Sequence, residues 1–399
     1  MDRSELIEEA RVAFVSRFGH EPEVVGVAPG RVELLGNHTD YNEGFVLTSA
    51  IDRGIAIAGC AREVPSARVT SLDQEGTVTF DPSAPSKDPN ATWSDYVKGV
   101  VDELNKAGAT IGGFDALIAS NVPSGAGVSS SAALEVATAQ LVLSLYPHRL
   151  MVDAMGLAKL CQRAENNFVG APVGVLDQFS SIFGQAGHAL FLDCRTLEHR
   201  TVRLPADRAR ILIADSGVKH ALALGGGYRE RRAQCEEAAR WFAARYPNDG
   251  IKTLRDVTPE MLEASEGKLE ATLAKRARHI VYENMRVKMG AEALQGGNIA
   301  AFGEMMSNTH ESIRRFFENS APEVDALVEI AQEQRGVYGA KLSGGGWGGS
   351  AVILHEPDIT EDLCAALADG YRQRFDRDAT LLPTVAAQGA ESRRFDDPL

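Results

Sequence analysis

The chain has 399 residues, of which 44% are hydrophobic and 24% charged, a globular composition at a length that suits one large two-lobed domain or two smaller domains. The formal net charge of -14 disfavours nucleic acids and anionic membranes as partners, so a few placed groups must hold any anionic ligand. Five scattered cysteines without a C-x-x-C spacing indicate neither a disulfide framework nor a zinc site, and they fit a reducing cytoplasm.

The first part of the chain begins with a helix and continues with apolar runs separated by loops. One face of the helix predicted near the N-terminus carries Leu6, Ile7, Ala10, Phe14 and Phe18. This pattern predicts a docked amphipathic helix and neither a signal peptide nor a membrane span. The runs that predict strands lie at residues 24–30, 44–51, 54–61 and 114–120.

Helices dominate the rest of the chain. Helical periodicity covers residues 131–146 and 150–170, and Gly170 is a candidate C-cap of the second helix. Strands are predicted at residues 188–196 and 210–217, and residues 227–335 are mostly helical before an apolar strand near residue 350. Clustered strands and clustered helices predict the α+β class. We expect two lobes, residues 1–210 and 211–399.

The stretch VPSGAGVSSSAALEVA, residues 122–137, follows a predicted strand and opens a predicted helix. Glycines let backbone N–H groups approach an anion closely, and the N-terminus of a helix adds its dipole. The stretch therefore predicts a phosphate-binding loop, although an ordinary strand-to-helix turn with a serine N-cap explains it equally well. It is not a Walker A loop, because the Gly-Lys-Ser/Thr ending is missing.

A second segment, Ala28–Gly44, brings polar side chains together between apolar runs. These side chains are Arg31, Asn37, His38 and Asp40. Such a variety of donors and acceptors suits a hydroxyl-rich ligand, because each sugar hydroxyl both donates and accepts. The alternative is a polar hairpin loop in which Asn and Asp serve the turn geometry and His38 is structural.

The third segment, KLSGGGWGGS at residues 341–350, formally satisfies G-x-G-x-x-G from Gly344 to Gly349. A dinucleotide-binding fingerprint must follow a strand and open a helix, whereas this one opens a strand near the C-terminus. We expect instead a backbone-rich loop that braces the phosphate loop from the other lobe.

Two acidic residues join the three segments as candidate functional residues. Asp177 is predicted in a turn after the helix that carries Glu165. One carboxylate can hold Mg²⁺ together with a hydroxyl of the phosphate loop while the other faces a substrate hydroxyl. Each acid alone would more often be a solvated surface residue. Together the motifs favour phosphoryl transfer to a sugar alcohol.

The three motifs in this order resemble the galactokinase branch of the superfamily of galacto-, homoserine, mevalonate and phosphomevalonate kinases. GRVELLGNHTDYNEG resembles the N-terminal galactokinase signature, VPSGAGVSSSAALEVAT the ATP loop, and KLSGGGWGGS the third motif. Further similar segments extend over nearly the whole chain. The resemblance implies two α+β lobes with nucleotide and sugar in the cleft between them, and a monomer.

The resemblance also implies roles for individual residues. It makes Asp177 the base that faces the anomeric hydroxyl, with Arg31 stabilising transition-state charge. It implies Mg²⁺ bound by Ser131 and Glu165, and support from Gly345 and Gly346 of the third motif. The implied sugar contacts are Asn37, His38, Thr39, Asp40 and Tyr228. The implied ATP contacts are Gly125, Ala126, Gly127, Val128, Ser129, Ser130 and Ser131.

Two positions depart from the galactokinase pattern. Asn37 stands where galactokinases typically carry Glu, and Glu33 stands where they carry Asn. The family Glu contacts the sugar near its C6 hydroxyl, so Asn37 removes a fixed negative charge from that end of the pocket. A galactose relative altered at C6 is therefore an alternative substrate. If Glu33 neighbours Asn37 across the loop, it restores the missing acceptor.

The sequence predicts an ATP-dependent sugar 1-kinase that phosphorylates galactose by direct in-line transfer with Mg²⁺ as cofactor. The alternative from another class is a catalytically silent sugar and ATP sensor that binds a regulatory partner. The complete run Ser129–Ala133, together with Arg31 and Asp177, favours the enzyme. Mevalonate or homoserine as substrate is disfavoured by the segments H-T-D-Y and D-Q-F.

Overall fold

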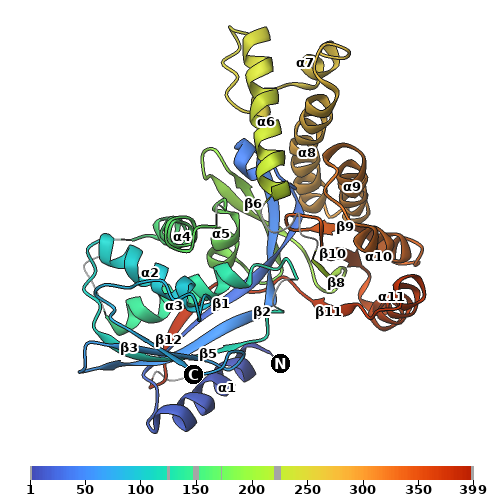
Figure 1. The fold of residues 1–399 in the computed structure, drawn as a ribbon. Helices are drawn as coiled ribbons and strands as arrows, with labels where there is room; N and C mark the ends of the chain where they lie inside the picture. Colours follow the sequence, from blue (N-terminus) through green and yellow to red (C-terminus); the bar gives the residue numbers. More distant parts are fainter. Residues whose placement is uncertain (1, 124–125, 147–151, 172, 220–225, 397–399) are drawn as a thin grey trace.

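The computed structural model describes residues 2–123, 126–146, 152–171, 173–219 and 226–396. The chain is a mixed α and β structure with two sheets, which confirms the predicted α+β class (Figure 1). None of the helices in these residues combines the length and the apolar character needed to cross a membrane.

The first sheet has eight strands and forms the N-terminal lobe. Six of them are ordered β12-β1-β2-β5-β3-β4, and β6 pairs with β2 and β7. Its strands are β1 (Val24–Leu35), β2 (Phe45–Arg62), β3 (Ala67–Ser71), β4 (Thr77–Phe80), β5 (Gly113–Ser120), β6 (His188–Asp193), β7 (His199–Arg203) and β12 (Glu391–Arg394). The two runs predicted at 44–51 and 54–61 are one continuous strand, β2, because β1 pairs with it along almost its whole length.

Helices cover both faces of this sheet. The helices of this lobe are α1 (Arg3–Phe18), α2 (Ser94–Lys106), α3 (Ser130–Leu145), α4 (Ala154–Arg163) and α5 (Leu176–Phe183). The predicted amphipathic helix is confirmed as α1, which packs its apolar face on one side of β1, β2 and β5. On the other side α3 lies close to β1 at Gly26, where a Cβ atom would meet Ala137 O at 2.3 Å.

The second sheet has four strands in the order β11-β8-β10-β9 and belongs to the C-terminal lobe. Its strands are β8 (Arg210–Lys219), β9 (Val337–Ser343), β10 (Gly348–His355) and β11 (Thr380–Thr384). The helices of this lobe are α6 (Gly226–Arg245), α7 (Pro259–Ala264), α8 (Ala271–Gln295), α9 (Ile299–Ser312), α10 (Pro322–Gln332) and α11 (Thr360–Phe375). In Figure 1, α6, α7 and α8 project beyond both sheets.

The predicted division at 210/211 falls at the first residue of β8. However, a single cut does not separate the two sheets, because β12 returns from the second lobe and pairs with β1. Both α1 and β12, which lie at opposite ends of the described residues, therefore belong to the first lobe.

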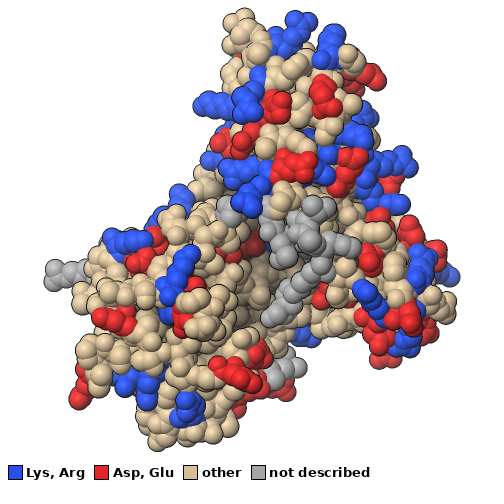
Figure 2. Space-filling model, in the orientation of Figure 1, with Lys and Arg blue, Asp and Glu red and all other residues tan. Residues whose placement is uncertain are grey.

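Charges are mixed on the face shown in Figure 2. Lys and Arg side chains alternate with Asp and Glu over the projecting helices, and the described residues of this face present no continuous basic area. A surface of mixed sign contrasts with the strongly basic stripe that marks a nucleic-acid-binding face.

Candidate active site

A cavity of about 610 Å³ lies where the predicted motifs meet. The predicted residues in its lining are Arg31, His38, Asp40, Asp177, Tyr228, Gly345 and Gly346. They come from β1, the loop after it, α5, α6 and the loop between β9 and β10. Among the described residues the lining also includes Glu33, Gly174 and Trp347. The fold thus brings distant parts of the chain together around one cavity.

Asp177 and Arg31 form the centre of this site. Arg31 Nε and Nη2 lie 2.9 and 2.7 Å from Asp177 Oδ1. Arg31 Nη1 also donates to the carbonyl oxygen of Gly127 at 2.7 Å, and Ser129 Oγ donates to Asp177 Oδ2 at 2.6 Å. The carboxylate is therefore oriented by the phosphate loop and neutralised by Arg31, while its side chain remains 23% exposed toward the cavity.

The position of Asp177 differs from the expected turn, because it is the second residue of the short helix α5. Phe179 buries one side of α5, while Leu176 and Asp177 line the cavity. A helix of eight residues is too short for its periodicity to separate it from a turn in the sequence. Glu165 lies in a π-helical segment, Ala164–Val169, that continues α4 and ends at Gly170 with φ 89°.

The predicted phosphate loop opens helix α3. Ala126 and Val128 are buried and Gly127 has a φ of 72°, so the loop presents backbone rather than bulky side chains. Ser129 adopts a left-handed φ of 57°, an uncommon conformation for a residue with a Cβ, directly before α3 begins at Ser130. The helix N-terminus then supplies free N–H groups and a positive dipole for an anion. Gly125 lies outside the described residues.

The third motif connects β9 to β10 and contacts the phosphate loop. Ser350 Oγ donates to the carbonyl oxygen of Ala126 at 2.6 Å. The loop itself closes at Gly346, which has a φ of 98°. A Cβ atom at this position would lie 2.2 Å from Asn319 O, so any larger residue is excluded. The dinucleotide alternative is not supported, because the strand β10 and not a helix follows these glycines.

A buried group of oxygen atoms lies beside the reaction centre. The Ser131 hydroxyl hydrogen-bonds Glu165, and Gln178 Nε2 donates to Glu165 Oε2 at 2.7 Å and to Glu135 Oε2 at 2.9 Å. Burial and the nearby charge of Asp177 raise the pKa of Glu165 to about 7, and burial raises the pKa of Glu135. Glu135 Oε1 has no hydrogen-bond partner among the described residues. Clustered, underused carboxylate oxygens are what a hard cation such as Mg²⁺ requires, so these residues fit a metal ion.

The predicted sugar-binding loop has two parts with different roles. His38 and Asp40 line the cavity, and burial raises the pKa of Asp40 to about 6. His38 Nε2 donates to the carbonyl oxygen of Gly345 at 3.0 Å and Nδ1 accepts from Tyr41 Oη at 2.9 Å, while burial lowers the pKa of His38 to about 3. His38 is therefore a neutral ring whose two nitrogens are already bonded.

Asn37 and Thr39 are buried behind this wall and are absent from the lining. Asn37 Nδ2 donates to the carbonyl oxygen of Gly344 at 3.0 Å, and Thr39 Oγ1 lies within hydrogen-bonding distance of the carbonyl oxygens of Gly36 and Phe45. On this geometry both residues fix the loop. Tyr228 also lines the cavity, with its ring 5.3 Å from that of His38, and burial raises the pKa of its hydroxyl, so it is a neutral phenol.

Several residues of this site were not assigned from the sequence. Helix α8 supplies His279 and Glu283 to the backbone of the sugar loop, and their spacing of four residues, which places both on one face of the helix, was a usable signal. Glu135 is likewise four residues after Ser131 on α3. Lys341, in contrast, gives no local signal that it reaches the first lobe.

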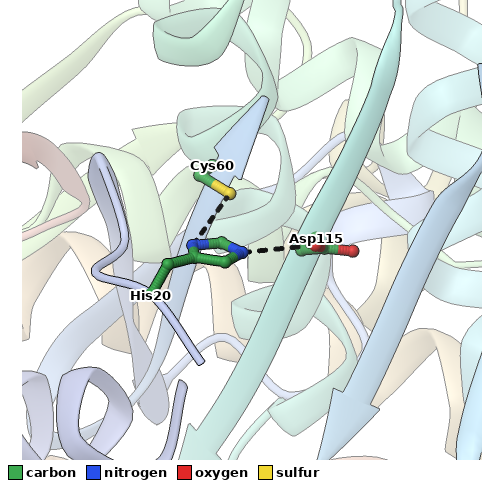
Figure 3. A group of neighbouring side chains, drawn as sticks. All are labelled: His20, Cys60 and Asp115. Atoms are coloured by element: carbon green, nitrogen blue, oxygen red, sulfur yellow. Dashed lines mark hydrogen bonds and ion pairs between the residues drawn. The ribbon is translucent and has the colours of Figure 1, made fainter. Parts of the chain in front are cut away.

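A separate cluster lies on the α1 side of the first sheet. Figure 3 shows His20 between Cys60 and Asp115, with Nδ1 3.8 Å from Cys60 Sγ and Nε2 3.8 Å from Asp115 Oδ2. The Asp115 carboxylate is already bonded to Arg68 at 2.7 and 2.6 Å, and Arg62 lies 3.5 Å away. Two guanidinium groups repel a cation, so this cluster is an ion-pair network and not a metal site.

Comparisons with known proteins agree with this geometry. The galactokinase galactose-binding signature matches residues 12–61, the N-terminal domain of GHMP kinases residues 95–185 and their C-terminal domain residues 291–373. A galactokinase of Roseiflexus sp. (strain RS-1) is 43% identical over 381 residues, which cover 96% of each chain.

Solved structures show the same relation. The galactokinase of Lactococcus lactis, in complex with galactose, superposes with a TM-score of 0.89 at 34% identity, covering 97% of this chain and 98% of that one. The mevalonate kinase of Methanococcus jannaschii, at 19% identity and a TM-score of 0.64 with 92% and 99% coverage, shares the fold. The chain belongs to the galactokinase family of the GHMP kinases.

Proposed function

We propose that the protein transfers the γ-phosphoryl group of ATP to the anomeric C1 hydroxyl of galactose, which gives galactose 1-phosphate and ADP. The observation that carries this proposal is the chain of contacts Gly127–Arg31–Asp177, which joins the phosphate loop to the sugar-sized cavity. The galactose complex of the similar Lactococcus lactis enzyme supports galactose as the substrate.

The described residues divide the reaction between them. Two nitrogens of Arg31 engage Asp177 Oδ1, whereas Oδ2 keeps a lone pair beside its bond from Ser129, so Oδ2 can accept the C1 hydroxyl proton. The sugar oxygen then bonds to the γ-phosphorus as the bond from that phosphorus to the bridging oxygen breaks, and ADP leaves. Arg31, whose guanidinium spans Asp177 and the phosphate loop, stabilises the charge that develops on the transferred group.

Magnesium is the proposed cofactor. Ser131 and Glu165 would hold it, and when bound it would neutralise charge on the nucleotide phosphates. Helix α3 and the loop residues 126–131 would bind the phosphates of ATP. We further propose that the enzyme acts as a monomer in the cytoplasm, where its unpaired cysteines are stable.

The first test measures ADP release from ATP and Mg²⁺ with galactose. Replacing Asp177 with Asn keeps the shape of the side chain but removes the proton acceptor, so kcat should fall by about 10²- to 10⁴-fold while ATP binding changes little. Asp115→Asn makes the same change at another Arg-paired carboxylate, outside the cavity, and should keep nearly normal kcat.

Near-normal turnover by Asp177→Asn would contradict the proposed role of Asp177. No ADP release by the wild type with galactose, D-fucose, L-arabinose or N-acetylgalactosamine would contradict the proposed activity and favour the non-catalytic sensor. No observation on the described residues favours the sensor, because the phosphate loop residues 126–131 and both Arg31 and Asp177 are in place.

A further inference from the structure

Glu33 is a carboxylate in the cavity wall that takes no part in the proposed phosphoryl transfer. It lies on β1 two residues after Arg31, and strand side chains alternate, so both point to the same face of the sheet. Both also line the cavity. Two residues of strand span about 6.6 Å, so Glu33 lies further along the wall than the Asp177 and Arg31 pair.

One oxygen of Glu33 is fixed from the other lobe. Lys341 of β9 is fully buried, and its Nζ donates to Glu33 Oε1 at 2.9 Å and to the Glu33 carbonyl oxygen at 3.0 Å. A buried ammonium needs such partners, which makes this pair a rigid link between β1 and β9. No hydrogen bond joins the second oxygen, Oε2, to another described residue, and that oxygen is not among the fully enclosed polar atoms.

Asn37 cannot offer a free hydrogen-bond acceptor to the cavity in this geometry. Its Nδ2 is bonded to the carbonyl oxygen of Gly344 at 3.0 Å, and its Oδ1 accepts from Asn319 Nδ2 at 3.3 Å. The residue is completely buried and does not line the cavity. The carboxylate acceptor at this part of the wall is therefore Glu33 and not the side chain at position 37.

We propose that Glu33 is a sugar-recognising residue: its Oε2 accepts a hydrogen bond from a galactose hydroxyl on the side of the ring away from C1, at C3, C4 or C6. Together with Asp40 and Asp177 it makes the pocket selective for neutral sugars over sugars that carry a carboxylate. This proposal rests on the proposed galactose 1-kinase activity.

The test compares wild type and Glu33→Gln on galactose and its 3-, 4- and 6-deoxy derivatives. Glutamine still offers an oxygen to Lys341, so the buried link is retained in a weaker form. We expect kcat/KM for galactose to fall about 10- to 100-fold through the sugar KM, with the KM for ATP unchanged. The one deoxy sugar that lacks the partner hydroxyl should be almost insensitive to the substitution.

Galacturonate provides the second comparison. The wild type should discriminate strongly against it, and Glu33→Gln should narrow the ratio of kcat/KM between galactose and galacturonate. Asp115→Asn, which removes the charge of a buried ion-paired carboxylate outside the cavity, should leave both the ratio and the deoxy-sugar pattern unchanged.

A uniform fall in kcat/KM on all the sugars would show that Glu33 only maintains structure and would overturn the proposal. A rise in the KM for ATP as large as that in the KM for sugar would do the same. If Glu33→Gln does not fold, the fallback variant is Glu33→Asp, which keeps the charge beside Lys341 but shortens the side chain by one methylene. The proposal requires that this variant, too, affects the one deoxy sugar that lacks the partner hydroxyl least. Failure of the proposed function looks different, because the wild type would then release no ADP with galactose.

Discussion

At the scale of single residues, the buried carboxylate of Asp40 lowers the stability of the folded protein at neutral pH. Burial, with the charges of Glu33 and Asp177 nearby, raises the pKa of Asp40 to about 6 from its ordinary value of 3.8. The folded state therefore binds this proton more tightly than the unfolded state. The free energy of unfolding falls as the pH rises from about 4 to about 6, and the loss persists at higher pH.

Replacing Asp40 with Asn should raise the melting temperature at pH 7.5, because the buried charge is removed. The gain in free energy of unfolding is on the order of 2 kcal/mol, and it should shrink as the pH is lowered to 5. Thermal unfolding of both proteins across this range measures the effect. A gain in free energy of unfolding that does not depend on pH would show that Asp40 is not the titrating group. The same substitution should also raise the KM for sugar, because Asp40 lines the cavity and a hydrogen-bond acceptor is lost there.

The sequence predicts residues of this site when their chemistry follows from a motif. Arg31 and Asp177 are 146 positions apart, yet the resemblance places both at one reaction centre, and their 2.7 Å contact agrees with that expectation. Glu33 could be noticed as a departure from the pattern, but whether it restores the acceptor missing at Asn37 stayed open, because its partner Lys341 is 308 residues away. Pairing at such a separation depends on the packing of the two lobes, which local sequence does not encode.

At the scale of elements, helix α8 is the support of the sugar loop. Glu283 Oε1 accepts from the backbone N–H groups of Gly36 and Asn37 at 2.7 and 3.2 Å, and His279 Nε2 donates to the Asn37 carbonyl oxygen at 3.0 Å. Asn284 Oδ1 accepts from the N–H of Phe45 at 2.9 Å. One helix of the second lobe thus fixes both ends of the loop that carries His38 and Asp40.

Glu283→Gln should loosen this loop. Although burial opposes ionisation, Arg286 and His279 together with the loop N–H groups lower the pKa of Glu283 to about 2, so the substitution removes a charge that is bonded on both oxygens. We expect a loss of about 1 to 3 kcal/mol in the free energy of unfolding and a larger rise in the KM for sugar than for ATP.

The control for this variant is Glu292→Gln, an exposed position on the same helix, which should change neither quantity. An equal rise in both KM values for Glu283→Gln would indicate a general loss of folding rather than a loosened sugar loop.

Elements were predictable where apolar residues recur at helical spacing over several turns, on one face in α1 and nearly all round in α3. Helices α1 and α3 and the C-cap at Gly170 agree with the periodicity of the sequence. The π-helical segment that carries Glu165 was not predictable, because a π turn adds one residue to a turn without a change in composition. The short helix α5 was missed for lack of length.

At the scale of the whole molecule, the α+β class followed from the grouping of strands and helices, but the return of β12 to the first sheet did not. A strand of four residues, Glu391–Arg394, carries three charged side chains and has no apolar alternation to mark it. Its place is determined by the edge of β1, where Val24–Val27 pair in antiparallel register with Glu391–Arg394.

Removing residues 391–399 should therefore expose the edge of β1. We expect a lower melting temperature and association that increases with protein concentration, because an unpaired edge strand pairs readily with other chains. Thermal unfolding and size-exclusion chromatography measure both effects. A chain that ends at Phe395 keeps β12 and serves as the control; equal behaviour of the two truncations would show that β12 does not protect this edge.

The position of β12 also bears on how the protein is made. Ribosomes synthesise β1 before the other described strands and β12 after them, so the edge of the first sheet stays unpaired while the second lobe is translated. Polypeptides interrupted late in synthesis would contain every residue of the proposed site and still lack the strand that closes the sheet. Closure of that sheet thus depends on the translation of residues 391–394, which come after the segments that form the proposed site.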